Sequence, residues 1–262
     1  KDLYLQISSM GDKKPDIVAG NDLPDFNPDE EYLQELKSPI YYAVQNDIDI
    51  RTGGPTLIDF DMQRIRQRIN IILNIRTEGD IKKEDLLPPI IELSGACGHF
   101  NISEACLDTT RLYRMVHQAQ PDEFTQTGEN TYRCVVHFHT LGVIPSAAKG
   151  HLNGPGILQV ALQVSANRLD ASGAPVLDQD GKPVKNSRYI YGAINPYDEL
   201  TAAQLIEVRD GKTYLRYSKD DVNIEITSPL VIKADQIVSD DTGMGWQPND
   251  PTNPDDDIII EI

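Results

Sequence analysis

His137 and His139 stand two residues apart within the stretch TYRCVVHFHT, residues 131–140. In an extended strand both rings leave the same face, where they could share a metal ion with a carboxylate from a neighbouring strand. No third ligand stands at a recognisable spacing, and an outward-facing pair on a half-exposed strand accounts for the same pattern. We therefore expect neither a metal site nor any other cofactor.

The cysteines Cys97, Cys106 and Cys134 offer two further kinds of chemistry. His99 follows Cys97 by two residues, so its imidazole could lower the pKa of the thiol and make it a nucleophile. No local signature of a known cysteine enzyme surrounds the pair. If the protein is exported, a disulfide between Cys97 and Cys106 is better supported than a nucleophilic Cys97, and it leaves Cys134 without a cysteine partner.

Asp178, Asp180 and Gly181 resemble the opening of a calcium-binding loop. The fifth position of that loop is Lys182, however, and Tyr189 stands at the twelfth position, where a glutamate ligand is required. The segment is therefore predicted to be a turn. Because the chain also lacks a phosphate-binding glycine loop and the common hydrolase motifs, we expect a protein that is not an enzyme, although paired carboxylates would escape motif analysis.

Composition narrows the classes of partner. The 262 residues include 24 basic and 41 acidic side chains, so the net charge is -17 at pH 7. Such a chain repels a phosphate backbone, which disfavours nucleic acid and anionic lipid as partners. No apolar run approaches the roughly 20 residues that cross a bilayer. With 39% hydrophobic residues, the chain can build packed cores in one large or two ordinary domains.

Residues 64–76, RIRQRINIILNIR, show the clearest pattern in the chain. Isoleucine and leucine keep one parity while arginine and asparagine keep the other, and Ile72 is the one exception. A period of two is typical of a strand with one buried face. Further strands are predicted at residues 3–7, 40–44, 56–60, 90–93, 131–139, 158–165, 187–193, 214–217, 222–226 and 230–238.

Two short helices interrupt this pattern. Asn27, followed by Pro28 and three acids, has the form of a helix start, and Pro39 would end that helix. A second helix is predicted at residues 200–208. Residues 103–118 suit either a helix or a strand, and we favour the strand.

Residues 169–176 and 177–184, LDASGAPV and LDQDGKPV, are two near copies placed head to tail. Each contains a glycine that can supply a positive φ, so each is predicted to be a turn. Known repeat folds need units of about 20 residues or more, so this duplication is a local loop feature.

The C-terminal end carries four isoleucines among its last five residues, after a polar stretch at residues 239–257. That polar composition cannot form a core. The isoleucines favour a strand, since each buried aliphatic side chain contributes roughly 1.5 to 3 kcal/mol. The strand could close the sheet of its own domain, or it could add to the edge of a neighbouring molecule.

Several stretches together resemble the fimbrillins and fimbrial anchor subunits of Bacteroidetes surface pili. They are SPIYYAV at residues 38–44, IDFDMQRIRQRINIILNI at 58–75, ELSGACGHFNI at 92–102, TYRCVVHFHTLGV at 131–143 and ADQIVSDDTGMGW at 234–246. The resemblance implies two β-sandwich domains of the transthyretin-like type and assembly by strand exchange between subunits. It also implies export as a lipoprotein to the outer membrane, anchored through a lipid-bearing cysteine that would precede Lys1.

The sequence therefore predicts an all-β protein with an N-terminal sandwich at residues 1–127 and a C-terminal sandwich at 128–262. We expect a non-catalytic pilus subunit at the cell surface that meets other fimbrial subunits or its own copies, with a host or bacterial surface ligand as a further partner. The alternative is a secreted carbohydrate-binding protein, for which Trp246 and 11 tyrosines supply aromatic rings. The side chains expected to act in assembly are Leu3, Leu5, Ile7, Ile258, Ile260 and Ile262.

Overall fold

The computed structural model describes residues 4–6, 9–11, 31–45, 48, 50, 52–216 and 221–234. Within these residues the chain forms fifteen strands, one α-helix and one short 3-10 helix, η1 (Lys83–Asp85). The predicted all-β class is confirmed. No helix in the described part of the chain is long and apolar enough to span a membrane.

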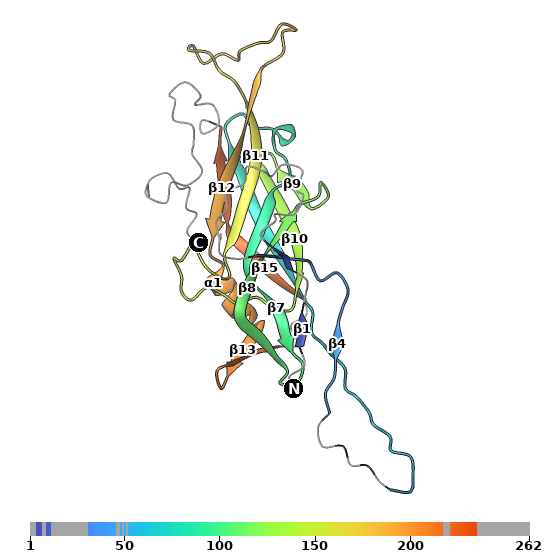
Figure 1. Ribbon diagram of the computed structural model, residues 1–262. Helices are drawn as coiled ribbons and strands as arrows, with labels where there is room; N and C mark the ends of the chain where they lie inside the picture. Colours follow the sequence, from blue (N-terminus) through green and yellow to red (C-terminus); the bar gives the residue numbers. More distant parts are fainter. Residues whose placement is uncertain are drawn as a thin grey trace.

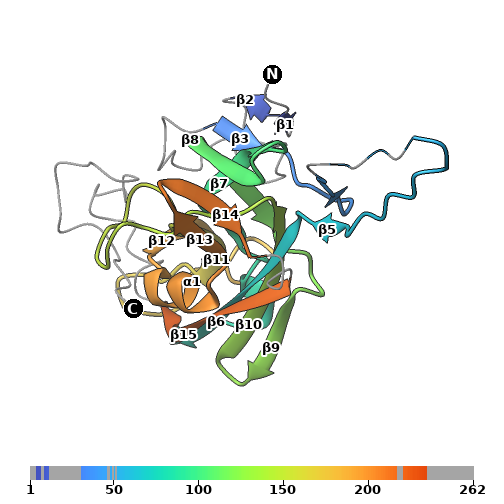
Figure 2. The ribbon, with the colours of Figure 1, turned by 90° about the horizontal axis from the view of Figure 1, so that it is seen from below.

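The larger sheet has nine strands (Figures 1 and 2). Its main path runs β12 (Lys185–Ile194), β11 (Leu158–Asn167), β7 (Ile90–Asn101), β8 (Cys106–Gln118), β14 (Lys212–Leu215) and β13 (Ile206–Arg209). Three short strands from the N-terminal part extend it: β1 (Tyr4–Gln6) on β7, β3 (Glu31–Leu33) on β8, and β2 (Ser9–Gly11) on β3. The β3–β8 pairing is parallel.

The smaller sheet has four strands in the order β15 (Asp221–Lys233), β6 (Gln67–Glu78), β10 (Thr131–Thr140) and β9 (Phe124–Gly128). β10 is antiparallel to β6, whereas β15 is parallel to it. The β15 register shifts between Ile226 and Leu230, and Pro229 occupies this irregularity, where its missing N–H breaks no ladder bond. A separate pair, β4 (Tyr41–Tyr42) and β5 (Gln63–Arg64), precedes β6.

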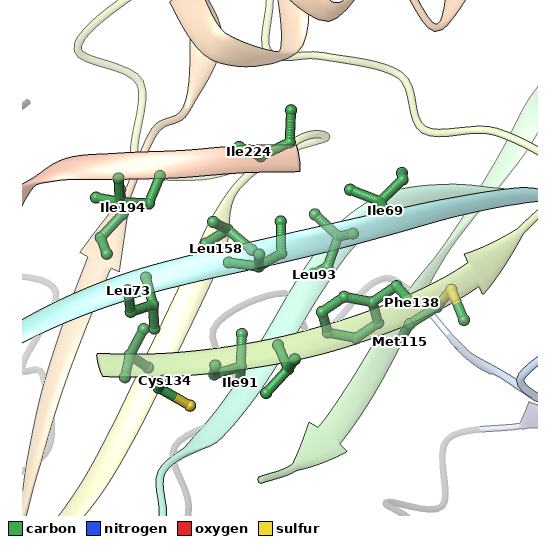
Figure 3. Close-up of a cluster of buried hydrophobic side chains, with 14 of the residues drawn as sticks. Ile69, Leu73, Ile91, Leu93, Met115, Cys134, Phe138, Leu158, Ile194 and Ile224 are labelled. Atoms are coloured by element: carbon green, nitrogen blue, oxygen red, sulfur yellow. The ribbon is translucent and has the colours of Figure 1, made fainter. Parts of the chain in front are cut away.

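One hydrophobic core lies between the two sheets (Figure 3). The predicted alternation in residues 64–76 is confirmed, because Ile69, Ile71, Leu73 and Ile75 are each at most 2% exposed. They pack with side chains from the larger sheet, which include Ile91, Leu93, Met115 and Leu158. Ile72, the exception to the pattern, lies on the opposite face between Val135 and Glu225.

The boundary expected between residues 127 and 128 does not separate two sheets or two cores. β10 and β15 pair with β6, and β11 pairs with β7, so each sheet combines strands from both sides of that position. The hydrophobic cluster likewise contains residues from both sides. The described strands therefore form one sandwich.

Close contact between backbones shapes the middle of β7. Gly95 has φ +81°. The backbone of residues 94–95 bonds to the segment 144–157: Ile144 N donates to Gly95 O (2.9 Å) and Ser94 N donates to Ile157 O (3.1 Å). A Cβ on Gly95 would lie 2.7 Å from the backbone nitrogen of Gly156. Only glycine fits both the positive φ and this approach.

Three predicted elements need correction. Residues 31–33 of the first predicted helix form strand β3, because Tyr32 and Leu33 are buried against the larger sheet; residues 27–30 lie outside the described part. The strand predicted at residues 56–60 is absent, since this segment is mostly exposed and forms no ladder with the described residues. The second helix is α1 (Tyr197–Ala203), and β13 replaces its predicted C-terminal half. Residues 106–118 form β8, so the preference for a strand there was correct.

Candidate interaction surfaces

A long segment between β4 and β5, residues 43–62, leaves the sandwich and projects away from it (Figures 1 and 2). We call it the arm. Only the two residue pairs Tyr41–Arg64 and Tyr42–Gln63 join its ends by a ladder. The described residues between these ends belong to no strand.

Exposed apolar side chains gather on the arm. Leu57 is 86% exposed and Ile50 is 75% exposed. The other large apolar side chains exposed on the arm are Val44, Ile48, Phe60 and Met62. Single exposed apolar residues are ordinary on protein surfaces, but a concentration of them on one segment marks an interaction site.

The arm also has the residue pattern of a strand. Ile58, Phe60 and Met62 alternate with Asp59 and Asp61. The same alternation of isoleucine and aspartate occurs in residues 47–50, on the other side of the turn sequence TGGP. A period of two produces one apolar and one acidic face. The pattern thus favours a strand that pairs outside the described part of this chain, which explains why sequence analysis predicted a strand where none is formed here.

A row of three arginines lies where the arm joins the sandwich. Arg64, Arg66 and Arg68 alternate with side chains that face the interior, Ile65, Gln67 and Ile69, so all three arginines leave the outer face. We call them the arginine row. Arg66 Nη1 donates to the carbonyl of Lys37 (2.6 Å). Partial burial, together with repulsion from Arg64 and Arg68, lowers the pKa of Arg66 below its usual value.

The two histidines of β10 do share this outer face, as expected, but each binds a different partner. His137 Nδ1 lies 2.7 Å from Asn70 Oδ1, and Arg68 Nη2 lies 3.2 Å from His137 Nε2. His139 Nδ1 lies 2.6 Å from Glu35 Oε1. Burial, and then the charge of Arg68, lower the pKa of His137. Within the described residues no group of three or more potential ligands could hold a metal ion.

Asn70 organises the centre of this face. Its Nδ2 donates to Asp221 Oδ1 (2.9 Å) and to Asn223 Oδ1 (2.7 Å) on β15, while its Oδ1 faces His137 on β10. Arg68 Nη2 lies 3.1 Å from His137 Nδ1 and 3.2 Å from Nε2, so the guanidinium group contacts both ring nitrogens. The bonds of Asn70 tie the edge strand β15 to β6 and β10 in the smaller sheet.

The cysteines do not form the expected disulfide. Cys97, Cys106 and Cys134 are all free and buried. Cys106 lies opposite Asn101 in the β7–β8 ladder, four residues along β7 from Cys97. At about 3.3 Å per residue that is roughly 13 Å, well beyond the about 7 Å that a disulfide can bridge.

The nucleophile hypothesis for Cys97 is contradicted by its surroundings. Burial, reinforced by the charge of Asp108, raises the pKa of the Cys97 thiol to about 12. Burial likewise raises the pKa of Cys134 to about 12. A nucleophilic cysteine requires the opposite shift, so both thiols act as small apolar side chains of the core.

Most of the side chains expected to act in assembly lie outside the described residues: Leu3, Ile7, Ile258, Ile260 and Ile262. Trp246 lies outside them as well. Leu5 belongs to β1 and lies opposite Phe100 in β7. It therefore contributes to the sheet of its own molecule.

The twin segments at residues 169–184 form two turns at the tip of the β11–β12 hairpin, at the top of Figure 1. Asp178 Oδ1 accepts from the backbone N–H groups of Asp180 (2.9 Å) and Lys182 (2.8 Å). Asp170 Oδ1 accepts in the same way from Ser172 and Ala174. The turn prediction is confirmed, since these carboxylates stabilise the local backbone.

No family model matches the chain, and neither does any curated protein. Comparison with solved structures finds a "putative adhesin" from Bacteroides ovatus, with 9% identity and a TM-score of 0.31. The match covers 71% of this chain and 54% of the other, so the chain spans about half the length of that neighbour. The resemblance to fimbrillins stays a prediction.

Proposed function

We propose that the protein is a non-catalytic structural subunit of a bacterial surface pilus, which assembles by strand addition between subunits and mediates adhesion. The observation that supports this proposal is the arm, an exposed segment with the alternation of a strand and no ladder partner in the described residues. A protein that displays such a segment gains most when another molecule supplies the missing sheet.

The energetic argument rests on the apolar face of the arm. Burial of one Leu, Ile or Phe side chain contributes roughly 1.5 to 3 kcal/mol. On that face Ile50, Phe60 and Met62 are each more than half exposed. An edge strand of a partner would bury them and would pair the backbone N–H and C=O groups of the arm at the same time.

The groups that could have supported catalysis have other roles. His137 and His139 bind Asn70 and Glu35, and the thiols of Cys97 and Cys134 stay protonated in the core. These contacts support a mechanical role over an enzymatic one.

The proposal is tested by photo-crosslinking in cells that produce the protein. A photoreactive phenylalanine analogue replaces Leu57, and in a matched variant it replaces Leu177, which is 57% exposed at the tip of the twin turns. We expect the variant at position 57 to give a covalent adduct with a neighbouring subunit in surface filaments, and the control to give much less. Equal labelling at both positions, or adducts only with intracellular proteins, would contradict the proposal.

A secreted carbohydrate-binding protein is the alternative, and Tyr41 and Phe60 are the observation in its favour. These rings are 55% and 54% exposed, whereas Tyr191, which stacks on Tyr189, is 8% exposed. Aromatic rings with an open face are the usual platforms for sugars. Binding on a glycan array that is lost in Tyr41→Ala and Phe60→Ala would favour this alternative.

A further inference from the structure

The second leg of the arm, residues 56–62, offers an apolar face, an acidic face and an unpaired backbone to another molecule. We propose that this leg accepts an extended segment of a different protein, in which apolar side chains alternate with lysine or arginine. The apolar side chains of that segment face Phe60 and Met62, and its basic side chains face Asp59 and Asp61. This inference rests on the proposed function and specifies the chemical class of the partner and the residues that receive it.

The backbone of the second leg is available for pairing. Residues 56–62 belong to no ladder, and none of their backbone groups bonds to another backbone group in the described part of the chain. The leg also projects away from both sheets (Figures 1 and 2), and Phe60 and Met62 are each 54% exposed. Such a segment gains both hydrogen bonds and buried apolar area when a partner strand adds to it.

The first leg of the arm, residues 43–50, is a poor partner for the second. The β4–β5 pairs fix the register in which the two legs would continue as a hairpin. In that register Val44 lies opposite Asp61. Gln45 lies opposite Phe60. Because directly opposite side chains share a face, each face of the hairpin would mix apolar with polar side chains, and neither could be buried. The pattern thus disfavours closure of the arm on itself.

The charge of the leg selects a basic partner. Asp61 accepts a hydrogen bond from Gln63 Nε2 (2.9 Å), which is a neutral amide. Asp59 forms no hydrogen bond or ion pair with a described residue. Opposite charges at directly opposite positions stabilise a pair of strands, and like charges destabilise it. The net charge of -17 also attracts a basic segment toward the molecule over a longer range.

A second folded copy of this chain does not supply that segment. Basic and apolar side chains alternate at residues 64–69, but β6 is already paired at Arg68, with β10 on one side and β15 on the other. Two second legs that paired with their apolar faces aligned would bring their carboxylates together on the opposite face, where like charges repel. We therefore assign the partner segment to a different protein.

Synthetic peptides test the inference with the purified full chain. The probe is a fluorescent peptide with blocked ends in which valine alternates with lysine. One control peptide has the same composition but carries the valines and the lysines in two separate blocks. A second has glutamate in place of lysine, and a third has N-methyl groups on its backbone amides, so that it cannot form a ladder. Fluorescence anisotropy measures binding.

Matched variants identify the site. Asp59→Asn with Asp61→Asn removes the charge of the acidic face, and Phe60→Ala removes the ring from the apolar face. The control is Asp122→Asn with Glu129→Gln, which neutralises two exposed carboxylates on either side of β9 and changes the net charge by the same amount. Circular dichroism and thermal unfolding verify that all variants are folded.

We expect the alternating peptide to bind wild type and the Asp122 and Glu129 control alike. The block, glutamate and N-methylated peptides should bind wild type about tenfold more weakly or worse, because each lacks one requirement of the paired strand. Asp59→Asn with Asp61→Asn, and separately Phe60→Ala, should weaken binding of the alternating peptide by about three- to tenfold.

Three outcomes would overturn the inference: no binding of the alternating peptide, equal binding of the block or N-methylated peptide, or full binding by the variant without Asp59 and Asp61. The crosslinking experiment separates this failure from a failure of the proposed function. If the analogue at position 57 crosslinks to a filament subunit while the alternating peptide does not bind, assembly stands and this class of partner is excluded. If the peptides behave as expected while no filament subunit is crosslinked, the class of partner stands and the pilus role is contradicted.

Discussion

The exposure of the arm predicts that its apolar side chains contribute almost nothing to the stability of a single molecule. Leu57 is 86% exposed, so the remaining buried fraction is 100 − 86 = 14%. If full burial of a leucine contributes roughly 1.5 to 3 kcal/mol, Leu57→Ala should lower the free energy of unfolding by about 0.2 to 0.4 kcal/mol.

Leu158 is the matched control, because it is the same residue type at 0% exposure at the start of β11 (Figure 3). Leu158→Ala removes buried methyl groups and leaves a cavity, so it should cost about 2 to 5 kcal/mol. Urea denaturation at low protein concentration measures both variants without a contribution from association.

A second measurement connects stability with function. Leu57→Ala should weaken association between molecules even though it hardly changes the unfolding midpoint. A loss of more than about 1 kcal/mol for Leu57→Ala would show that the arm packs on its own sandwich in solution, since such a loss is typical of buried positions. That result would refute the argument that the arm is available to a partner.

Three further predictions concern the sandwich itself. Gly156→Ala should destabilise the fold by roughly 2 to 4 kcal/mol in urea denaturation, because φ is +74° and the new Cβ would lie 2.6 Å from Ser146 N. Gly150→Ala, at φ +80° with no atom within 4 Å of the new Cβ, should cost only about 1 to 2 kcal/mol, and similar losses in the two variants would contradict the close approach. At pH 8 the thiols of Cys97 and Cys134, with pKa values raised to about 12, should be ionised in about one molecule in 10⁴ and should resist iodoacetamide until the protein unfolds; rapid labelling of the native protein would disprove their burial. Because the folded pKa exceeds the ordinary value of 9.0, the stability contributed by the protonated thiols should be present below pH 9 and should decline as the pH rises from 9 toward 12. Asn70→Ala should cost about 1 to 2 kcal/mol more in thermal or urea unfolding than Asn74→Ala. Asn70 joins Asp221, Asn223 and His137, whereas Asn74 Nδ2 donates to Ile226 O (3.2 Å). Equal costs would show that the network does not join the strands.

Strands buried on one face could be predicted from the sequence. Alternation in residues 64–76 located β6, and alternation in residues 131–139 and 158–165 located β10 and β11. In β6 and β10 the buried parity largely matches the apolar parity of the sequence, because a half-buried strand must place its apolar side chains on one face, whereas in β11 both faces are buried from Leu158 to Leu162.

Sequence reasoning failed where long-range contacts outweigh local preference. Residues 31–33 follow a good helix start but form β3, because burial of Tyr32 and Leu33 on the larger sheet contributes more than a helix cap. The division at residue 127 failed for the same reason: nothing local indicates that β15 will pair with β6.

The candidate site was visible in the sequence only in part. The alternation at residues 56–60 was recognised as a strand pattern, but a sequence alone does not say that its partner strand is missing from the described chain. The arginines were recognised as the polar face of a strand, and their position beside the arm required the β4–β5 pairing. The disulfide between Cys97 and Cys106 was wrong because the short turn at residues 102–105 places Asn101 opposite Cys106.

The parallel pairing of β15 with β6 determines when this polypeptide can finish folding. β6 ends at Glu78, and its partner does not begin until Asp221, so one flank of the smaller sheet stays open while the intervening chain is synthesised. Non-local pairings of this kind slow the search for the native state. A chain truncated before β15 therefore exposes the edge of β6 and a strip of unburied isoleucines, which favours aggregation until β15 pairs.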